Sequence, residues 1–237
     1  MLTFACLSPH APIFLPEVGS PADRQKVKTT INSLESLAPK LASPPTGGKP
    51  EIIFISSPHP DWGVNVPARF LLAQIQNLKF KIQNYQFANE VSVTDEPYRL
   101  YPILTTQESP KNHYQFGKLL ARKMPLGRSI AWIASGDMSH VLKKDGPYGF
   151  HPAGPKFDQK FIELLKKKKI DEILNLDQEF VEQAAVCGIW SFCLLFGVLD
   201  GLKVNWEPEV LSYEGPFGIG YLVADIRMDA NVNSANG

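Results

Sequence analysis

Three of the five histidines in this sequence stand just past the ends of short apolar runs. His10 and His59 each follow a Ser-Pro pair, and His140 follows the apolar run Ser129–Ala134 through a Ser-Gly-Asp turn. Imidazole nitrogens bind transition metals and exchange protons near neutral pH. Because ligands bind outside the carboxyl ends of the strands in open α/β sheets, we expect these three histidines to converge at one sheet edge.

Glu214 is the fourth residue whose type and position suit chemistry. It stands between two predicted strands, in the Gly- and Pro-rich turn Glu214–Gly218, where a carboxylate has no packing role. Two histidines and one carboxylate form the facial triad that binds Fe(II) and leaves three positions for substrate and O2. Zinc also accepts two histidines and a glutamate with an open position, so residue types alone leave both metals open.

The segments that must position these residues alternate between strand and helix patterns. The expected strands are 2–7, 51–56, 129–134, 209–213 and 219–226, and the expected helices are 20–38 with a stop at Pro39, a helix after Ser109-Pro110, 157–165, and 178–199 with Gly201 as its stop. Residues 61–109 are less clear: 66–75 fit a helix or a strand, 78–93 alternate as strands do, and 95–102 resemble a loop. We predict one α/β domain over residues 1–226, with a mostly parallel central sheet, helices on both faces and the metal site at the carboxyl ends of the strands. Residues 227–237 are predicted to be a disordered tail.

Composition narrows the class of partner and the compartment. The 237 residues are 44% apolar and carry a formal net charge of zero, which argues against nucleic acid or an anionic membrane as the main partner. The most apolar segment, Ala184–Leu199, is too short for a membrane span and is expected to be a buried helix. The cysteines Cys6, Cys187 and Cys193 are odd in number and lack Cys-x-x-Cys spacing, so we expect neither a disulfide framework nor a thiolate zinc site, and a cytoplasmic location.

Six short motifs follow one another along the chain: Ser8-Pro-His-Ala-Pro12, Ser57-Pro-His-Pro60, Ser135-Gly-Asp-Met-Ser-His140, Gly146-Pro-Tyr-Gly149, Ala184-Ala-Val-Cys-Gly188 and Leu211-Ser-Tyr-Glu-Gly-Pro-Phe-Gly-Ile-Gly-Tyr221. In this order and spacing they resemble the class III extradiol ring-cleavage dioxygenase family, the superfamily of the protocatechuate 4,5-dioxygenase β subunit. Within it, the chain is most similar to the branch related to Memo-like proteins. The resemblance implies that His10, His59 and Glu214 hold ferrous iron and that His140 is the acid–base residue just outside the metal shell.

The activity implied by the resemblance is O2-dependent cleavage of a catechol-type ring next to its two hydroxyls, an oxidoreductase reaction of aromatic catabolism. A histidine with a pKa near 6.5 is suited to take a proton from a substrate hydroxyl and to return it later. His140 would fill this role. Asp137 either orients His140 or caps the local turn, and we favour the turn role.

One departure from the family pattern concerns Trp62. The family usually carries Asp-His-Gly followed by Val-Pro, and the best match here is Asp61-Trp62-Gly63, followed by Val66-Pro67. A tryptophan in place of the histidine removes a hydrogen-bonding group and puts the usual ring cleavage in doubt. Trp62 then either stacks on an aromatic substrate or fills the pocket wall. Tyr148 either lines the pocket or packs beneath it, and Trp62, Tyr148 and Asp137 are the candidate substrate-binding residues.

Two further functions remain open beside the Fe(II)-dependent dioxygenase. The first is a metal-binding Memo-like protein without dioxygenase turnover, and the second is a zinc hydrolase or other zinc-dependent relative with the same ligands. The expected partners are a small aromatic diol and O2, together with a second copy of the chain or a small partner subunit. His113 and His151 are expected to be surface residues.

Overall fold

The computed structural model describes residues 1–72 and 98–229. These residues form a six-stranded sheet in the order β3-β2-β4-β1-β6-β5. The strands are β1 (Leu2–Ser8), β2 (Ile52–Ser57), β3 (Arg99–Leu104), β4 (Ile130–Ser135), β5 (Trp206–Glu214) and β6 (Tyr221–Met228). The pairs β1–β4, β2–β4 and β2–β3 are parallel, whereas β6 runs antiparallel to both β1 and β5. The predicted single α/β domain with a mostly parallel central sheet is therefore confirmed.

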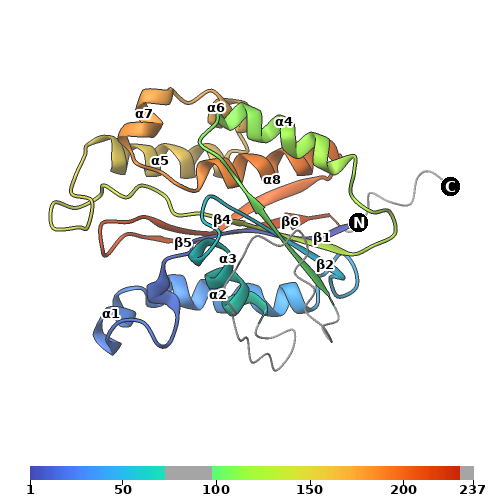
Figure 1. The fold of residues 1–237 in the computed structure, drawn as a ribbon, viewed down its shortest axis with the longest axis horizontal. Coiled ribbons are helices and arrows are strands. Elements are labelled where there is room, and N and C mark those ends of the chain that lie inside the picture. The colour runs from blue at the N-terminus through green and yellow to red at the C-terminus, as the bar shows by residue number, and fades with distance from the viewer. Residues whose placement is uncertain (73–97, 230–237) are drawn as a thin grey trace.

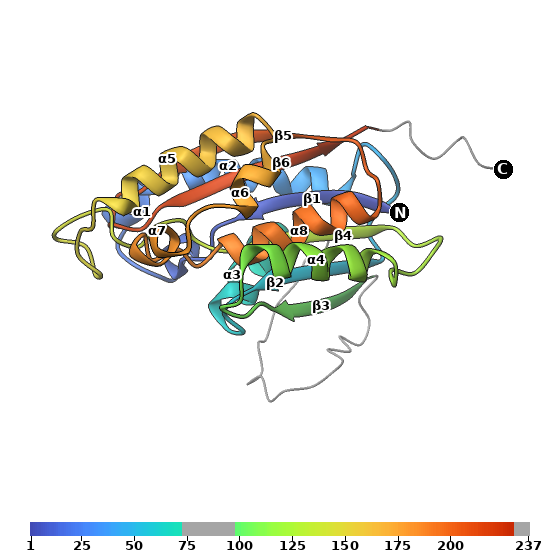
Figure 2. The ribbon, with the colours of Figure 1, turned by 90° about the horizontal axis from the view of Figure 1, so that it is seen from above.

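Helices cover both faces of this sheet, as predicted (Figure 1). The described helices are η1 (Pro12–Phe14), α1 (Pro21–Lys26), α2 (Lys28–Ala42), α3 (Trp62–Leu72), α4 (Pro110–Ala121), α5 (Ala153–Lys166), α6 (Ile170–Leu174), α7 (Gln178–Gln183) and α8 (Ile189–Gly201). Figure 1 shows α1, α2 and α3 on one side of the sheet and α4 to α8 on the other, and Figure 2 shows the strand order from above. None of the described helices is long and apolar enough to cross a membrane.

The strand β1 explains why the core has two halves. All seven of its residues are buried, as expected for a central strand that is covered on both faces. Because side chains alternate along a strand, Phe4 and Cys6 pack with the α2 and α3 side, whereas Ala5 and Leu7 pack with the α5 and α8 side. A continuous apolar run, rather than an alternating one, is the sequence signature of this arrangement.

The first helical segment differs from the prediction. Ser20 caps it as expected, with a capping box formed with Asp23, but the helix breaks at Val27 into α1 and α2. The α2 helix then passes through Pro39 and ends at Ala42. A proline near the carboxyl end of a helix removes one backbone hydrogen bond. Burial of Leu41, two residues further, favours continuing the helix.

The segment after α3 was predicted less well. Residues 66–72 are helical, as one of the two alternatives for 66–75 allowed, and the predicted strands at 78–93 lie outside the described residues. The predicted loop at 95–102 is wrong for its last part, because β3 begins at Arg99 and contains Pro102. Among the described strands β3 pairs only with β2, and an edge strand tolerates a proline because one row of its backbone groups is unpaired.

The carboxyl-terminal third contains the most consequential difference. The helix predicted over 178–199 is two helices, α7 and α8, separated by residues 184–188. Ala185 in this break has a φ of 50°, which ends the helical path. The last strand, β6, reaches Met228, two residues beyond the predicted end, and residues 230–237 of the predicted tail lie outside the described part of the chain.

Candidate metal centre

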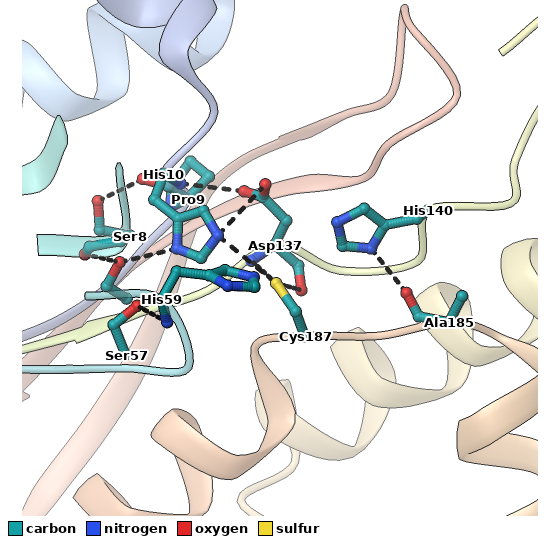
Figure 3. A network of polar contacts seen from close by, with 11 residues as sticks. Ser8, Pro9, His10, Ser57, His59, Asp137, His140, Ala185 and Cys187 are labelled. Atoms are coloured by element: carbon teal, nitrogen blue, oxygen red, sulfur yellow. Dashed lines mark hydrogen bonds and ion pairs between the residues drawn. The ribbon is translucent and has the colours of Figure 1, made fainter. Parts of the chain in front are cut away.

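The strands β1, β2 and β4 end side by side at one edge of the sheet. Ser8, the last residue of β1, is in register with Ser135 of β4, and Ser56 of β2 is in register with Ala134. The residues that follow these strand ends must therefore meet at this edge. The rings of His10 and His59 lie edge to face with their centroids 5.1 Å apart (Figure 3).

Sequence reasoning missed Cys187, which lies between the two groups of potential metal ligands. The donor atoms of His10, His59 and Cys187 lie within 4.8 Å of one another, and so do those of Asp137, His140 and Cys187. The Cys187 Sγ lies 3.6 Å from the His10 Nε2 and accepts the Asp137 backbone N–H at 3.1 Å. The available signal was the motif Ala184-Ala-Val-Cys-Gly188, which the prediction of one continuous helix concealed.

Two glycines allow Cys187 to approach the cluster. A Cβ atom on Gly136, directly after β4, would lie 2.1 Å from the Cα of Gly188. The Gly188 N–H also donates to the Asp137 carbonyl at 2.9 Å. The break between α7 and α8 is thus held in direct backbone contact with the exit of β4, at a distance that only glycine permits.

Hydrogen bonding fixes which nitrogen of His10 is free. The Ser135 hydroxyl donates its single hydrogen to the Gly63 carbonyl at 2.5 Å, so it must accept from the His10 Nδ1–H at 3.0 Å. The proton therefore resides on Nδ1, and the Nε2 lone pair faces Cys187. This is the tautomer that a metal-binding histidine needs, with its second nitrogen held by a hydrogen-bond acceptor.

Burial keeps the His10 ring neutral. Only 4% of the residue is exposed, and desolvation, helped by the neighbouring His59, lowers its pKa to about 3. The 3.8 Å separation between the His10 Nε2 and the Asp137 Oδ2 is consequently no ion pair at neutral pH. Asp137 instead accepts the His10 backbone N–H at 3.0 Å, and burial raises the pKa of its carboxyl to about 6. It thereby anchors the exit of β1.

His140 is held in a similar way by a backbone carbonyl. Its Nδ1–H donates to the Ala185 carbonyl oxygen at 2.6 Å, which leaves Nε2 as a free acceptor. Burial lowers the pKa of His140, partly opposed by the nearby Asp137. In Figure 3 the free ring nitrogen faces the side on which Asp137 lies. A neutral imidazole with a free Nε2 can accept a proton.

The remaining predicted residues near the cluster are more open to solvent. His59 is exposed, and its backbone N–H donates to the Ser57 hydroxyl at 3.1 Å. Trp62 begins α3, three residues after His59, and is 47% exposed. Tyr148 is 64% exposed, and its ring meets the His140 ring edge to face with centroids 5.3 Å apart. The Tyr148 ring is thus available to a ligand that approaches His140, and the Trp62 side chain is open to solvent at the start of α3.

Glu214 is placed differently from the histidines. It is the last residue of β5, and its Oε1 accepts the backbone N–H of Thr30 at 2.8 Å and the Thr30 hydroxyl at 2.6 Å. Neither group of potential ligands among the described residues includes Glu214. The carboxylate thus links β5 to α2 in this structure, and its proposed role as a metal ligand remains a prediction.

The two histidines expected at the surface have structural contacts. His113 is 6% exposed, so the prediction was wrong for this residue. Its Nε2 accepts the Thr106 N–H at 3.2 Å and thereby closes the loop before α4. The His151 Nδ1 accepts the Ala153 N–H at 3.2 Å at the start of α5.

Known proteins resemble this chain in sequence and in fold. Residues 55–224, which contain His59, His140 and Cys187 but not His10, match the family described as "Catalytic LigB subunit of aromatic ring-opening dioxygenase". Protein CA_C1420 of Clostridium acetobutylicum is 28% identical over 281 residues, an alignment that covers 96% of this chain and 58% of that protein. The chain therefore spans little more than half of that relative. The crystal structure of uncharacterized protein JW3007 from Escherichia coli K12 has a TM-score of 0.56 at 16% identity, covering 95% of this chain and 100% of that one, which concerns the fold alone.

Proposed function

Because the chain belongs to the family of the catalytic LigB subunit of aromatic ring-opening dioxygenases, we propose that it is a non-haem Fe(II)-dependent extradiol-type dioxygenase. Its substrate would be a catechol-type ring, opened next to the two hydroxyls. The observation that carries the proposal is the convergence of His10, His59, Asp137, His140 and Cys187 from three strand exits and one helix break. Three imidazoles in one cluster, two of them with a defined free nitrogen, suit metal-dependent chemistry better than structural packing.

The donor set fits a transition metal. His10 is neutral, its Nε2 is unprotonated, and His59 lies beside it. Soft thiolates and imidazoles bind iron, copper and zinc, whereas a carboxylate in third place favours the facial triad of Fe(II) oxygenases. We propose His10 and His59 as two ligands and Glu214 as the third, with Cys187 as the competing third ligand. Bound iron would supply a redox-active Lewis acid that holds the diol and O2 together.

His140 would move the proton of the substrate hydroxyl. Its Nδ1–H is committed to the Ala185 carbonyl, so only Nε2 can accept a proton from a diol bound near Asp137. Its lowered pKa keeps the ring in the basic form at neutral pH. After ring opening, the same nitrogen would return the proton. Trp62 and Tyr148 would contact the aromatic face of the substrate through their exposed rings.

A second candidate is a metal-binding protein without dioxygenase turnover. The position of Cys187 favours it, because a thiol 3.6 Å from the His10 Nε2 competes with a carboxylate for the third ligand position. Two histidines and one cysteine also suit zinc, as in a zinc-dependent relative. Trp62 in place of the family histidine points in the same direction.

The test is O2 uptake by protein loaded with Fe(II) under anaerobic conditions and offered a panel of catechols. We expect uptake and ring-opened product from wild type and from His151→Asn, a control that preserves the acceptor at the start of α5. We expect His140→Gln to bind iron but to lose at least about 100-fold in kcat, the usual contribution of a general acid–base residue. Iron binding without uptake on any diol would overturn the dioxygenase proposal in favour of the second candidate.

Metal binding by two further variants identifies the third ligand. If Glu214 is the ligand, Glu214→Gln loses Fe(II) affinity and Cys187→Ser retains it. The reverse result would assign the position to the thiolate. Stoichiometric zinc in the purified protein, with no iron-dependent activity, would favour the zinc-dependent relative, and absence of any metal binding would overturn all three functions.

A further inference from the structure

Asp158 is a buried carboxylate outside the metal centre. It lies on α5, is 1% exposed, and takes part in none of the ion pairs found among the described residues. Burial raises its pKa to about 7, opposed by its hydrogen bonds. A carboxylate without a cationic partner is costly to bury, and a leucine or asparagine would satisfy the packing of α5 at lower cost. Its contacts therefore require an explanation.

The two oxygens of Asp158 connect the segments that carry two predicted functional residues. Oδ1 accepts the backbone N–H of Ser139 at 2.9 Å, and Oδ2 accepts the Tyr213 hydroxyl at 2.6 Å. Ser139 directly precedes His140, and Tyr213 directly precedes Glu214. Because side chains alternate along β5, Tyr213 points toward α5 while Glu214 points toward Thr30 of α2.

The backbone repeats this connection between the two segments. The Met138 N–H donates to the Gly220 carbonyl at 2.8 Å, and the Gly220 N–H donates to the Ser139 carbonyl at 2.8 Å. A Cβ atom on Gly220 would lie 2.3 Å from the Asp158 Oδ2, so glycine is needed for the carboxylate to reach Tyr213. We call the antiparallel pair β5 and β6, with the connecting residues 215–220, the β5–β6 arm. The turn before His140 and this arm therefore form one unit, with Asp158 at its centre.

We propose that Asp158 is a positioning residue that fixes the His140 imidazole relative to the β5–β6 arm, by accepting the Ser139 amide and the Tyr213 hydroxyl together. The role rests on the proposed function in so far as His140 transfers the substrate proton. Without Asp158, the Ser139 amide loses its acceptor, and the turn is held only by its backbone hydrogen bonds with Gly220. The Nε2 of His140 would then leave its place beside Asp137, although the metal ligands remain intact.

The test compares Tyr213→Phe and Asp158→Leu, which removes both acceptor oxygens, with Tyr114→Phe. Tyr114 donates to Asp200 at 2.9 Å between α4 and α8, and thus provides the same chemical pair away from the cluster. We expect Tyr213→Phe and Asp158→Leu to lower kcat by about 10- to 100-fold, with KM and Fe(II) affinity within about twofold of wild type. We expect both to shift the ¹⁵N resonances of the His140 ring in the folded, metal-free protein. Tyr114→Phe should change neither.

The resonance measurement needs no turnover, so it separates this proposal from the proposed function. If the iron-loaded protein opens no diol but both variants still shift the His140 resonances, the positioning role holds and the dioxygenase proposal fails. Unchanged His140 resonances in a folded Tyr213→Phe variant would overturn the positioning role, whatever the activity. This variant keeps the Ser139 amide bonded, so it serves as the decisive test if Asp158→Leu does not fold.

Discussion

The two Ser-Pro-His segments are nearly identical in sequence and differ in their surroundings. His10 is buried, its Nδ1–H is held by Ser135, and its backbone N–H is held by Asp137. His59 is exposed, and its own motif holds it through the backbone, because its N–H donates to the Ser57 hydroxyl. The two imidazole rings nevertheless lie edge to face beside each other.

The difference follows from the positions of the strands in the sheet. β1 lies between β4 and β6, so the residues after it are covered from both sides, whereas β2 lies next to β3, the outermost of the described strands. A centre built in this way would hold its metal with one rigid and one adaptable ligand. Rigidity preorganises a site, and an exposed ligand leaves room for a substrate to enter.

The largest expected effect comes from removing each ring. His10→Ala and His59→Ala should both lose stoichiometric metal, measured by calorimetric titration with Fe(II) under anaerobic conditions. Only His10→Ala should also lower the free energy of unfolding of the metal-free protein, by about 1–3 kcal/mol, because it removes a buried, hydrogen-bonded group. Equal losses of stability in the two variants would refute the contrast between a fixed and an adaptable ligand.

A subtler change separates the two serines. Ser135→Ala removes the acceptor that fixes the tautomer of His10, and metal affinity should fall about 10- to 100-fold. Ser57→Ala removes an acceptor for the His59 backbone and should cost less than about tenfold. Both can be measured in the same titration. A larger loss with Ser57→Ala would mean that the exposed histidine, and not the buried one, limits metal binding.

The sequence was sufficient to predict which residues follow the strands, but not which segments of the chain pack against those residues. His10, His59 and His140 follow apolar runs and turn residues, and both signals are local. The fold class follows from the same runs, because a strand that is apolar on both faces belongs in a covered parallel sheet. Nothing local distinguishes the burial of His10 from the exposure of His59, since strand order decides it.

The position of Cys187 depends on a contact between distant residues. Ala184–Leu199 is apolar throughout and fits one helix, whereas the break at 184–188 is held by Gly136, which lies about fifty positions earlier in the chain. Glu214 is a similar case, because its carboxylate is bound by Thr30, 184 residues away. Periodicity describes neighbours along a helix and carries no information on such contacts.

The pH dependence of the free energy of unfolding gives a third test of the contrast between the buried His10 and the exposed His59. The pKa of His10 is about 3 in the folded protein and 6.5 by default, so between these values only the unfolded chain binds the proton. The contribution of His10 to the free energy of unfolding is therefore present above pH 6.5 and is lost as the pH falls toward 3. Between pH 7.5 and pH 5 the loss is about 2 kcal/mol. The free energies of unfolding of metal-free wild type and His10→Gln, measured in urea, should differ by about 2 kcal/mol less at pH 5 than at pH 7.5. A difference that does not change with pH would contradict the burial of a neutral His10.

The smallest expected effect concerns Ala185, which holds His140 as Ser135 holds His10. Its φ of 50° is unfavourable for a residue with a Cβ, and Lys203 has a similar φ of 54° far from the cluster. Ala185→Gly and Lys203→Gly should each change the free energy of unfolding by less than about 1 kcal/mol, because relief of strain opposes the added freedom of the unfolded chain. Only Ala185→Gly should broaden or shift the ¹⁵N resonances of His140, because its carbonyl then samples other directions. If both variants leave those resonances unchanged, the Ala185 carbonyl does not orient His140, and the turn at Ser139 alone holds it. His10 would then be the one histidine of the cluster whose ring orientation is fixed by a hydrogen bond.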